Sequence, residues 1–321
     1  MSEAINRVTS MPIVIDCDPG IDDVVALALA ARSPALELVA VTSTYGNATL
    51  ADTTRNAREI LARLDSEVNV LPGADRPRMR PLHTTPETHG PTGVGYADVP
   101  AATTVTPNPT VLLDVLAELD DPVTLVTLGP LTNLSYALEA DGPLVHSRVR
   151  RHLGMFGSLR ERGNTNRWAD FNSWCDPEAT ATVLEAALGT EMVGLDVTRR
   201  MTFPTSVVER LATSPDAVVA WLAQALQFYV EFHRSQERLD GCVVNDVLPI
   251  GELIHAGVLS YQDVELLVDL DDGEHRGHTR ERNGGTVTRV ALGVDVPRMR
   301  VLLERVFGSG WSDEAGSGGG P

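Results

Sequence analysis

The stretch MPIVIDCDPGIDDVVALALAAR, residues 11–32, contains the pattern that decides the fold. Its first part, residues 11–15, is a short run rich in β-branched side chains, and Pro19-Gly20 marks a turn. Residues 24–31 form an Ala/Leu-rich segment that ends before Ser33-Pro34. Such a succession is typical of a buried strand, a turn and a helix. We therefore predict that this stretch begins an α/β fold.

The same alternation continues along the chain. Strands are predicted at residues 36–42, 68–71, 123–128, 152–156, 191–195, 264–269 and 286–294, and helices at 50–64, 109–119, 131–140, 177–187 and 215–234. Strands that alternate with helices indicate parallel strands joined by crossover helices. We predict one domain over residues 11–308, built on an open, mostly parallel sheet flanked by helices. A flexible N-terminus at 1–10 and a disordered Gly/Ser-rich tail at 309–321 are expected to flank it.

One connection stands out because of its length. Residues 73–108 are rich in Pro, Gly and Thr, and they separate two predicted elements. Connections this long within a compact domain are uncommon and are often functional. We expect this stretch to contribute to the site.

Composition excludes several kinds of function. The 321 residues include 44 acidic and 26 basic side chains, a net charge of −18, and every basic residue is Arg. Without Lys there is no Schiff-base chemistry, no pyridoxal-phosphate lysine and no phosphate-binding loop lysine. The acidic balance argues against nucleic acid or an anionic membrane as a partner.

The cysteines and the N-terminus bear on the compartment. Cys17, Cys175 and Cys242 are far apart and form no C-x-x-C pattern, so neither a disulfide framework nor a zinc site is indicated. The first ten residues hold no apolar core of a signal peptide, and no uninterrupted apolar stretch reaches about 18 residues. We expect a soluble protein of the reducing cytoplasm.

Four carboxylates follow the first predicted strand within eight residues, at Asp16, Asp18, Asp22 and Asp23. Helix capping accounts for one or two acids at such a place, but not for four. Carboxylates this close repel each other, so either some are protonated or a cation holds them ionised. A hard cation with oxygen ligands, Ca²⁺ before Mg²⁺, fits such a cluster. The spacing predicts that Asp18 and Asp23 face the ion, while Asp22 is left to bind a neutral polar ligand.

Residues 16–23 resemble the N-terminal fingerprint of the inosine-uridine-preferring nucleoside hydrolases, and further matches follow in order along about 300 residues. These matches are Thr44-Tyr-Gly-Asn47, His89-Gly-Pro-Thr-Gly93, Leu128-Gly-Pro-Leu-Thr-Asn133, Met155-Phe-Gly157, Asp170-Phe-Asn172 with Asp176-Pro-Glu178, and Asn245-Asp246. The resemblance implies a Rossmann-like fold. It also implies calcium-dependent hydrolysis of ribonucleosides to ribose and free base.

The resemblance also implies roles for individual residues. Calcium would be held by Asp18, Asp23, the backbone carbonyl of Leu128 and Asp246, and Asp18 would activate a calcium-bound water as general base. The water would attack the anomeric carbon through an oxocarbenium-like transition state. Ribose would be recognised by Asp22, Asn47, Met155, Asn164, Asp170, Asn172 and Asp246. The family usually has Glu at the Asp170 position, so the shorter side chain here has less reach to the 5′-hydroxyl.

The main departure from the family pattern is Asn245, where many members have a His that helps the base leave. Asn is not an acid at neutral pH and only forms hydrogen bonds. His233 and Tyr229, on the predicted aromatic helix, are candidates for this task, and the alternative is that they only pack on a helix face. His89 either belongs to a loop that closes over the substrate or lies exposed in a Gly/Pro-rich loop.

Two other functions are compatible with parts of the sequence. A phosphatase of the haloacid dehalogenase type also begins with Asp-x-Asp after a strand, but it needs a later basic residue, usually Lys, and a second acidic pair that is absent. A calcium-dependent nucleoside-binding homologue with weak turnover is the other alternative, and Asn245 is its support. The family resemblance further implies a homodimer or homotetramer, and it leaves the preferred nucleobase open.

Overall fold

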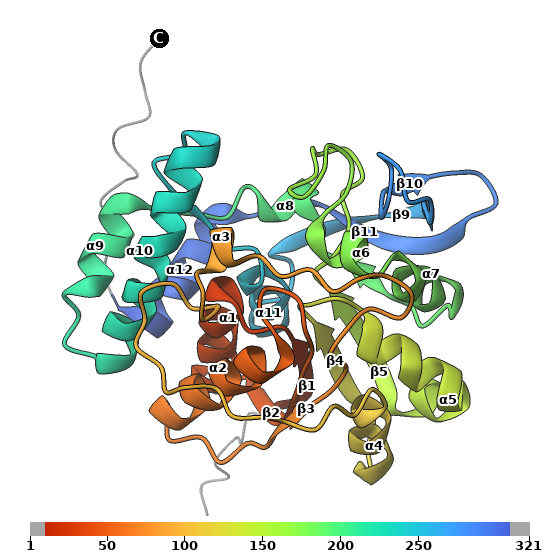
Figure 1. Ribbon diagram of the computed structural model, residues 1–321, viewed down its shortest axis with the longest axis horizontal. Coiled ribbons are helices and arrows are strands. Elements are labelled where there is room, and N and C mark those ends of the chain that lie inside the picture. The colour runs from red at the N-terminus through yellow and green to blue at the C-terminus, as the bar shows by residue number, and fades with distance from the viewer. Residues whose placement is uncertain (1–9, 309–321) are drawn as a thin grey trace, which may run out of the picture.

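The computed structural model describes residues 10–308, in which the central sheet has the strand order β10-β9-β11-β6-β5-β4-β1-β2-β3 (Figure 1). Its parallel part comprises β1 (Met11–Cys17), β2 (Leu36–Ser43), β3 (Val70–Pro72), β4 (Val123–Thr127), β5 (Val149–Gly154), β6 (Glu191–Met192) and β11 (Thr286–Val294). The antiparallel strands β9 (Leu259–Val268) and β10 (Thr279–Glu281) extend the β11 edge. The expected open, mostly parallel sheet is confirmed.

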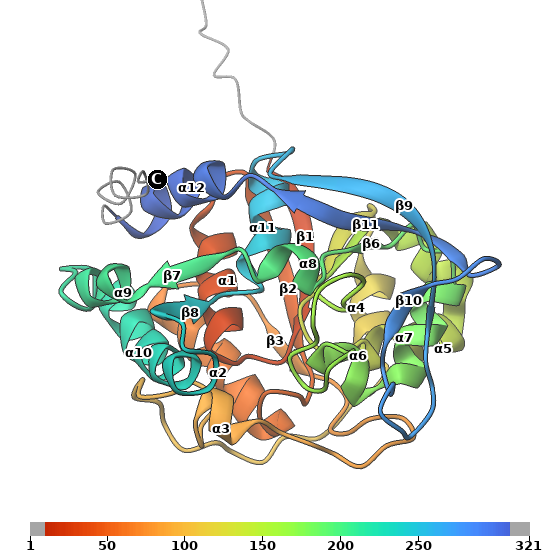
Figure 2. The ribbon, with the colours of Figure 1, turned by 90° about the horizontal axis from the view of Figure 1, so that it is seen from above.

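Helices cover both faces of the sheet (Figures 1 and 2). One face carries α1 (Ile21–Arg32), α2 (Leu50–Arg63), α10 (Ala217–Glu237), α11 (Val247–Ile254) and α12 (Val296–Phe307). The other carries α4 (Val111–Glu118), α5 (Thr132–Arg148) and α7 (Pro177–Glu185). Shorter elements are α3 (Pro86–His89), α6 (Phe171–Cys175), α8 (Leu195–Thr198), α9 (Thr205–Ala212) and the antiparallel pair β7 (Thr202–Pro204) and β8 (Gly241–Val243).

The first strand is buried on both faces, as its uninterrupted apolar run requires. Ile13 and Ile15 are fully buried in the core that includes α1 and α2. Val14, between them, is fully buried in the core that includes α4 and α5. Side chains alternate between the faces of a strand, so β1 joins the two cores.

The strand order creates a crevice at the end of β1. The chain moves from β1 to β2 and β3 in one direction and then returns to place β4 on the other side of β1. Ligands of open α/β sheets bind outside the carboxyl ends of the strands where the order reverses in this way. The acid-rich turn after β1 therefore lies at the expected ligand-binding edge.

The structure corrects several element boundaries. α1 begins at Ile21 and not at residue 24, because Gly20 is its N-cap and the Asp23 carboxylate accepts from the Gly20 N–H at 2.9 Å. β5 spans 149–154 and not 152–156, and the strand predicted at 191–195 ends at Met192, after which α8 begins. α10 extends to Glu237, three residues beyond its predicted end. The predicted loop 73–108 contains α3, and α6, α9, α11, α12, β7, β8 and β10 were not predicted.

Two expectations concern the ends of the chain and membranes. The predictions of a flexible N-terminus and a disordered tail lie outside the described residues, except at Ser10. Within residues 10–308, no helix combines the length and the apolar character that a membrane span needs.

Candidate functional site

Side chains that follow β1, β2, β4, β5 and β8 meet around one inner cavity of about 110 Å³. It opens into a wider hollow of about 1190 Å³, with which it shares wall residues such as Thr85, Asn164 and Arg199. Every residue predicted to bind substrate lines the inner cavity: Asp22, Asn47, His89, Met155, Asn164, Asp170, Asn172, Tyr229, His233 and Asp246. Leu128 and Asn245 line it too. Their roles remain predictions, but the structure brings all of these residues together.

Buried carboxylates gather at this cavity, where Asp22 and Asp246 belong to the lining and Asp18 and Asp23 do not. Asp22, Asp23 and Asp246 each offer an oxygen, and these atoms lie within 4.8 Å of one another. Asp18 lies outside this set of three, although its N–H donates to the Asp23 carboxylate at 3.3 Å. All four side chains are at most 4% exposed. The cluster therefore includes Asp22, which the sequence spacing had predicted to bind a neutral polar ligand instead of facing the ion.

Within residues 10–308, no Arg or His forms an ion pair with these four carboxylates. Burial, followed by repulsion from Asp23, raises the pKa of Asp18 well above its ordinary value. Burial and repulsion from neighbouring acids likewise raise the pKa of Asp246, and they raise that of Asp23 to about 7. Oδ1 of Asp18 and Oδ1 of Asp22 are buried without a hydrogen-bond partner. Orphaned carboxylate oxygens in a buried cluster fit an oxygen-coordinated cation such as Ca²⁺.

The Asp18 carboxylate is held in one orientation. Its Oδ2 accepts from the Asn47 N–H at 2.8 Å, and the Asn47 side chain donates to Asp23 at 3.0 Å. Gly46 and Gly129 pack directly against this carboxylate, and a Cβ at Gly129 would come within 2.6 Å of Oδ1. Gly46 also has a φ of +155°, which only Gly adopts without strain. The free Oδ1 of Asp18 is thus fixed in position by backbone on two sides.

Asp170 and Asn172 form the wall that holds backbone carbonyls in place. Asn172 Nδ2 donates to the Leu128 carbonyl at 2.7 Å and to the Met155 carbonyl at 2.8 Å. Asp170 is the N-cap of α6, and its carboxylate accepts from the N–H groups of Gly157, Asn172 and Ser173. Backbone amides therefore engage the Asp170 carboxylate. This is the side chain that is shorter than the usual Glu of the family, and whose reach to the 5′-hydroxyl the sequence had put in question. Asp170 orients Asn172, which in turn orients the Leu128 carbonyl.

Replacing Asp170 by Ala should affect both stability and activity. The lost cap should lower the free energy of unfolding by about 0.5–2 kcal/mol, and misplacement of Asn172 should lower kcat by up to about 10²-fold. Asp295 caps α12 by accepting from the Arg298 N–H at 3.0 Å, outside the cavity lining. Asp295→Ala is thus the matched control, and it should lose stability but keep kcat. Chemical denaturation and steady-state kinetics measure the two effects, and equal kcat for both variants would contradict a positioning role.

Asn245 is held against the acidic cluster. Its Nδ2 donates to Asp22 Oδ2 at 3.0 Å and its backbone N–H donates to the same oxygen at 3.3 Å. Its own Oδ1 is buried without a hydrogen-bond partner. Asn245 therefore orients Asp22 and leaves one acceptor unused in the cavity wall.

Two histidines and a tyrosine line the cavity beside the acidic cluster. The Tyr229 ring centre is 5.2 Å from that of His89 and 4.5 Å from that of His233. All three side chains are at most 5% exposed, so His89 is buried and not exposed in its loop. His89 Nδ1 accepts from the Ile21 N–H at 3.1 Å, and His233 Nδ1 lies 2.9 Å from the Tyr229 carbonyl.

The structure adds cavity residues that no motif indicated. Arg199 and Glu237 line both hollows and form an ion pair at 3.6 Å. Other additions are Thr85, Thr88, Thr165, Leu195, Phe232 and Val243, and Phe171 of the Asp170-Phe-Asn172 motif lines the cavity without having been predicted to. Glu237 follows Tyr229 and His233 at intervals of four residues on α10, so helical periodicity would have indicated it if the helix had been extended past residue 234.

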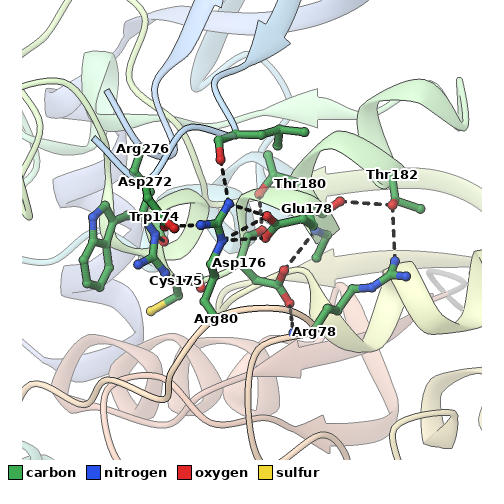
Figure 3. A network of polar contacts seen from close by, with 12 residues as sticks. Arg78, Arg80, Trp174, Cys175, Asp176, Glu178, Thr180, Thr182, Asp272 and Arg276 are labelled. Carbon is green, nitrogen blue, oxygen red and sulfur yellow. Dashed lines mark hydrogen bonds and ion pairs between the residues drawn. The ribbon is translucent and has the colours of Figure 1, made fainter. Parts of the chain in front are cut away.

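The long stretch before α4 is anchored beside α7, away from α10 (Figure 2), by the polar network drawn in Figure 3. Arg80 pairs with Glu178 and with Asp272, and the Arg78 N–H donates to Asp176 Oδ2 at 3.0 Å. This network joins the stretch to α7 and to the loop between β9 and β10. It holds the chain that leads to Thr85, Thr88 and His89, as expected for a functional connection.

Outside the cavity, ligand atoms of Asp269, His275 and His278 also lie within 4.8 Å of one another. Arg280 already donates to both oxygens of Asp269 at 2.9–3.0 Å. That carboxylate is therefore neutralised by a side chain, unlike the acids in the cavity.

Comparisons with known proteins find a matching family model and named relatives. The family model described as inosine-uridine preferring nucleoside hydrolase matches residues 13–301. The pyrimidine-specific ribonucleoside hydrolase RihA of Enterobacter sp. (strain 638) is 39% identical over 232 residues, which cover 71% of this chain and 74% of the relative. RihA of Shewanella sp. (strain MR-7) is 35% identical over 260 residues, covering 79% and 81%.

Solved structures resemble the whole fold. A plant nucleoside hydrolase, PpNRh1, superposes with a TM-score of 0.84 at 26% identity, covering 93% of this chain and 99% of that one. A purine-preferring ribonucleoside hydrolase from Gardnerella vaginalis gives 0.82 at 26% identity, covering 92% and 98%.

Proposed function

Because the chain belongs to the inosine-uridine preferring nucleoside hydrolase family, whose members are hydrolases of N-glycosyl bonds, we propose that it hydrolyses ribonucleosides to ribose and free nucleobase. The observation that carries the proposal is the cluster of buried, uncompensated carboxylates at the cavity. Such a cluster suits both a hard cation and the hydroxyl groups of a sugar. The named relatives include pyrimidine-specific and purine-preferring enzymes, so the preferred nucleobase of this protein has to be measured.

We propose Ca²⁺ as the cofactor, with Asp18, Asp23, Asp246 and the Leu128 carbonyl as its ligands. The raised pKa values of these buried carboxylates support a bound cation, which would hold them ionised. Asn172 orients the Leu128 carbonyl and leaves its second lone pair available. When bound, the ion would make water more acidic and would stabilise developing negative charge on oxygen.

The protein's own groups carry out the remaining steps. Asp18 accepts the proton of the attacking water on its free Oδ1, because Oδ2 is engaged by the Asn47 N–H. Asp22, Asn47 and Asp246 bind the ribose hydroxyls next to the reacting carbon. The surrounding carboxylates stabilise the positive charge that develops on the sugar.

Ribose should be preferred over deoxyribose. The cavity buries polar groups that pair with sugar hydroxyls, and each group left unpaired costs about 1–3 kcal/mol. The wall formed by Met155, Asn164 and Asn172 completes the polar surface around the sugar.

One assay tests the proposed function. Uridine, cytidine, inosine and adenosine are incubated with the protein, and reducing sugar is measured with Ca²⁺ and with a chelator. Release of ribose that depends on Ca²⁺ supports the proposal. Nucleoside binding without ribose release would favour the binding homologue that Asn245 suggests, and release of inorganic phosphate from phosphate esters would favour the phosphatase.

Replacing Asn245 by His should raise the rate with at least one nucleoside by about tenfold or more, because His can give a proton to the departing base. A His side chain can also keep a hydrogen bond to Asp22. The rate is measured across the same four nucleosides. A lower rate with all four would show that Asn245 is needed to orient Asp22.

Two further expectations belong to this proposal. Cys17, Cys175 and Cys242 are buried and unpaired, which supports a reducing, cytoplasmic location. We also propose a homodimer or homotetramer that acts on small-molecule nucleosides. Light scattering of the purified protein measures the oligomeric state.

A further inference from the structure

The cavity lining combines two kinds of side chain, each suited to one part of a nucleoside. The acids and amides suit ribose hydroxyls, whereas Tyr229 and Phe232 present aromatic rings suited to a planar base. The rings of His89 and His233 both lie against Tyr229, at 5.2 and 4.5 Å from its ring centre. Burial raises the pKa of the Tyr229 hydroxyl well above its ordinary value, and Asn245 cannot act as an acid. A group that gives a proton to the departing base should therefore be one of the two histidines.

Hydrogen bonding restricts His89 to one state. Its Nδ1 accepts from the Ile21 N–H at 3.1 Å, so the proton of the neutral ring is on Nε2. A second proton on Nδ1 would break this bond and set two buried N–H groups against each other. Burial lowers the pKa of His89 to about 4, which agrees with a permanently neutral ring. His89 is therefore a hydrogen-bond donor and a support for the turn at Ile21.

His233 has the opposite arrangement. A carbonyl oxygen only accepts hydrogen bonds, so the contact of 2.9 Å to the Tyr229 carbonyl places a proton on Nδ1 of His233. The other nitrogen, Nε2, can then gain or lose a proton without disturbing that bond. His233 can thus change its charge and keep its position, whereas His89 cannot.

The charges around His233 come from several elements. Glu237 on α10 and Asp22 on α1 favour its charged form, whereas Arg199 after α8 and His89 on α3 oppose it. Burial is the largest influence and holds the pKa of His233 below its ordinary value. The charged ring is therefore a stronger acid than free histidine, as a proton donor to a weakly basic leaving group must be.

We propose that His233 is the general acid of this enzyme and that it takes over the task for which Asn245 is unsuited. This inference rests on the proposed nucleoside hydrolysis. As the bond between C1′ and the base nitrogen breaks, its electron pair moves onto the base, and Nε2 of His233 gives its proton to the base. Water supplies hydroxide to C1′ and a proton to Asp18, and proton exchange with solvent restores both side chains. The sum is nucleoside plus water to ribose plus base.

The test compares two leaving groups in wild type and His233→Gln. A natural nucleoside needs a proton on its base, whereas p-nitrophenyl β-D-ribofuranoside releases a stable phenolate without one. We expect His233→Gln to lower kcat/KM for the nucleoside by about 10²–10⁴-fold, and for the nitrophenyl riboside by less than about fivefold. The retained activity also shows that the variant folds.

The pH profile gives a second readout. Wild type should lose nucleoside activity as the pH rises through the pKa of His233, since the acid must be protonated, and His233→Gln should lack this decline. A matched variant, His89→Gln, should lower the rates with both leaving groups alike, because it loosens the turn that carries the acids.

Three outcomes would overturn the inference: equal loss with both substrates in His233→Gln, no loss with either, or a nucleoside-specific loss in His89→Gln instead. Failure of the proposed function is distinguishable from these, since wild type would then release neither base nor nitrophenol. His233→Asn serves as a second variant if the Gln variant does not fold.

Discussion

Asp18→Asn should lower kcat for ribonucleoside hydrolysis by about 10²–10⁴-fold and leave the fold intact. The amide oxygen of Asn can still accept from the Asn47 N–H, so the local hydrogen bond is kept. The buried negative charge is removed, so stability without calcium should not fall. Kinetics at saturating Ca²⁺ and thermal unfolding measure the two quantities. Asp18→Ala should lose turnover as well.

Glu252→Gln provides a matched control for Asp18→Asn. Glu252 is another buried carboxylate that accepts from backbone N–H groups, those of Gly257 and Leu259, and it lies beside Arg151 and not in the acidic cluster. The same change from carboxylate to amide should leave kcat unchanged there. Full activity of Asp18→Asn would show that a different group accepts the proton from water.

Removing divalent cations with a chelator should abolish turnover, and added Ca²⁺ should restore it. The cause is the set of acids proposed as ligands, Asp18, Asp23 and Asp246, since carboxylates hold a cation only while they are ionised. Calcium should also stabilise the fold, by about 2.7 kcal/mol at a concentration 100 times its dissociation constant. Ribose release and melting temperature are the two measurements. Undiminished turnover after exhaustive chelation would contradict the calcium proposal.

The stabilisation should depend on pH in a defined direction. Without calcium, the raised pKa values of Asp18, Asp23 and Asp246 mean that the folded state holds more protons than the unfolded one. The calcium-free protein should therefore lose stability as the pH rises from about 4 through 7, the value for Asp23. Calcium should raise the melting temperature more at pH 8 than at pH 5.5. An equal rise at both pH values would place calcium elsewhere.

Much of the fold could be predicted because local sequence and fold agree there. The β-branched run of β1 and the Ala/Leu-rich α1 have the periodicity and turn chemistry of their final state. The prediction for 131–140 ended at a real irregularity, because α5 has non-helical backbone at Asp141 shortly before Pro143. The short elements β7, β8 and β10 were missed, because three-residue strands carry little periodicity and depend on partners distant in sequence.

The candidate site likewise has a part that neighbouring residues predict and a part that depends on residues distant in sequence. The acid-rich turn at residues 16–23 was recognisable because its carboxylates lie close together in sequence. The restraint on His89 depends on Ile21, which is 68 positions earlier, so its buried, neutral state could not be predicted locally. The engagement of Asp170 by three backbone amides likewise required the chain around α6.

By itself, the sequence determined the α/β class, the strand that leads into the carboxylates and the excess of negative charge at its end, because each of these depends on neighbouring residues. Only the tertiary structure decided that Asp22 joins Asp23 and Asp246, and that His89 accepts from a backbone N–H whereas His233 lies against a backbone carbonyl. The physical reason is that the charge state of a buried group depends on the atoms packed against it. In this cavity those atoms come from α1, α3, α10 and the segment after β8.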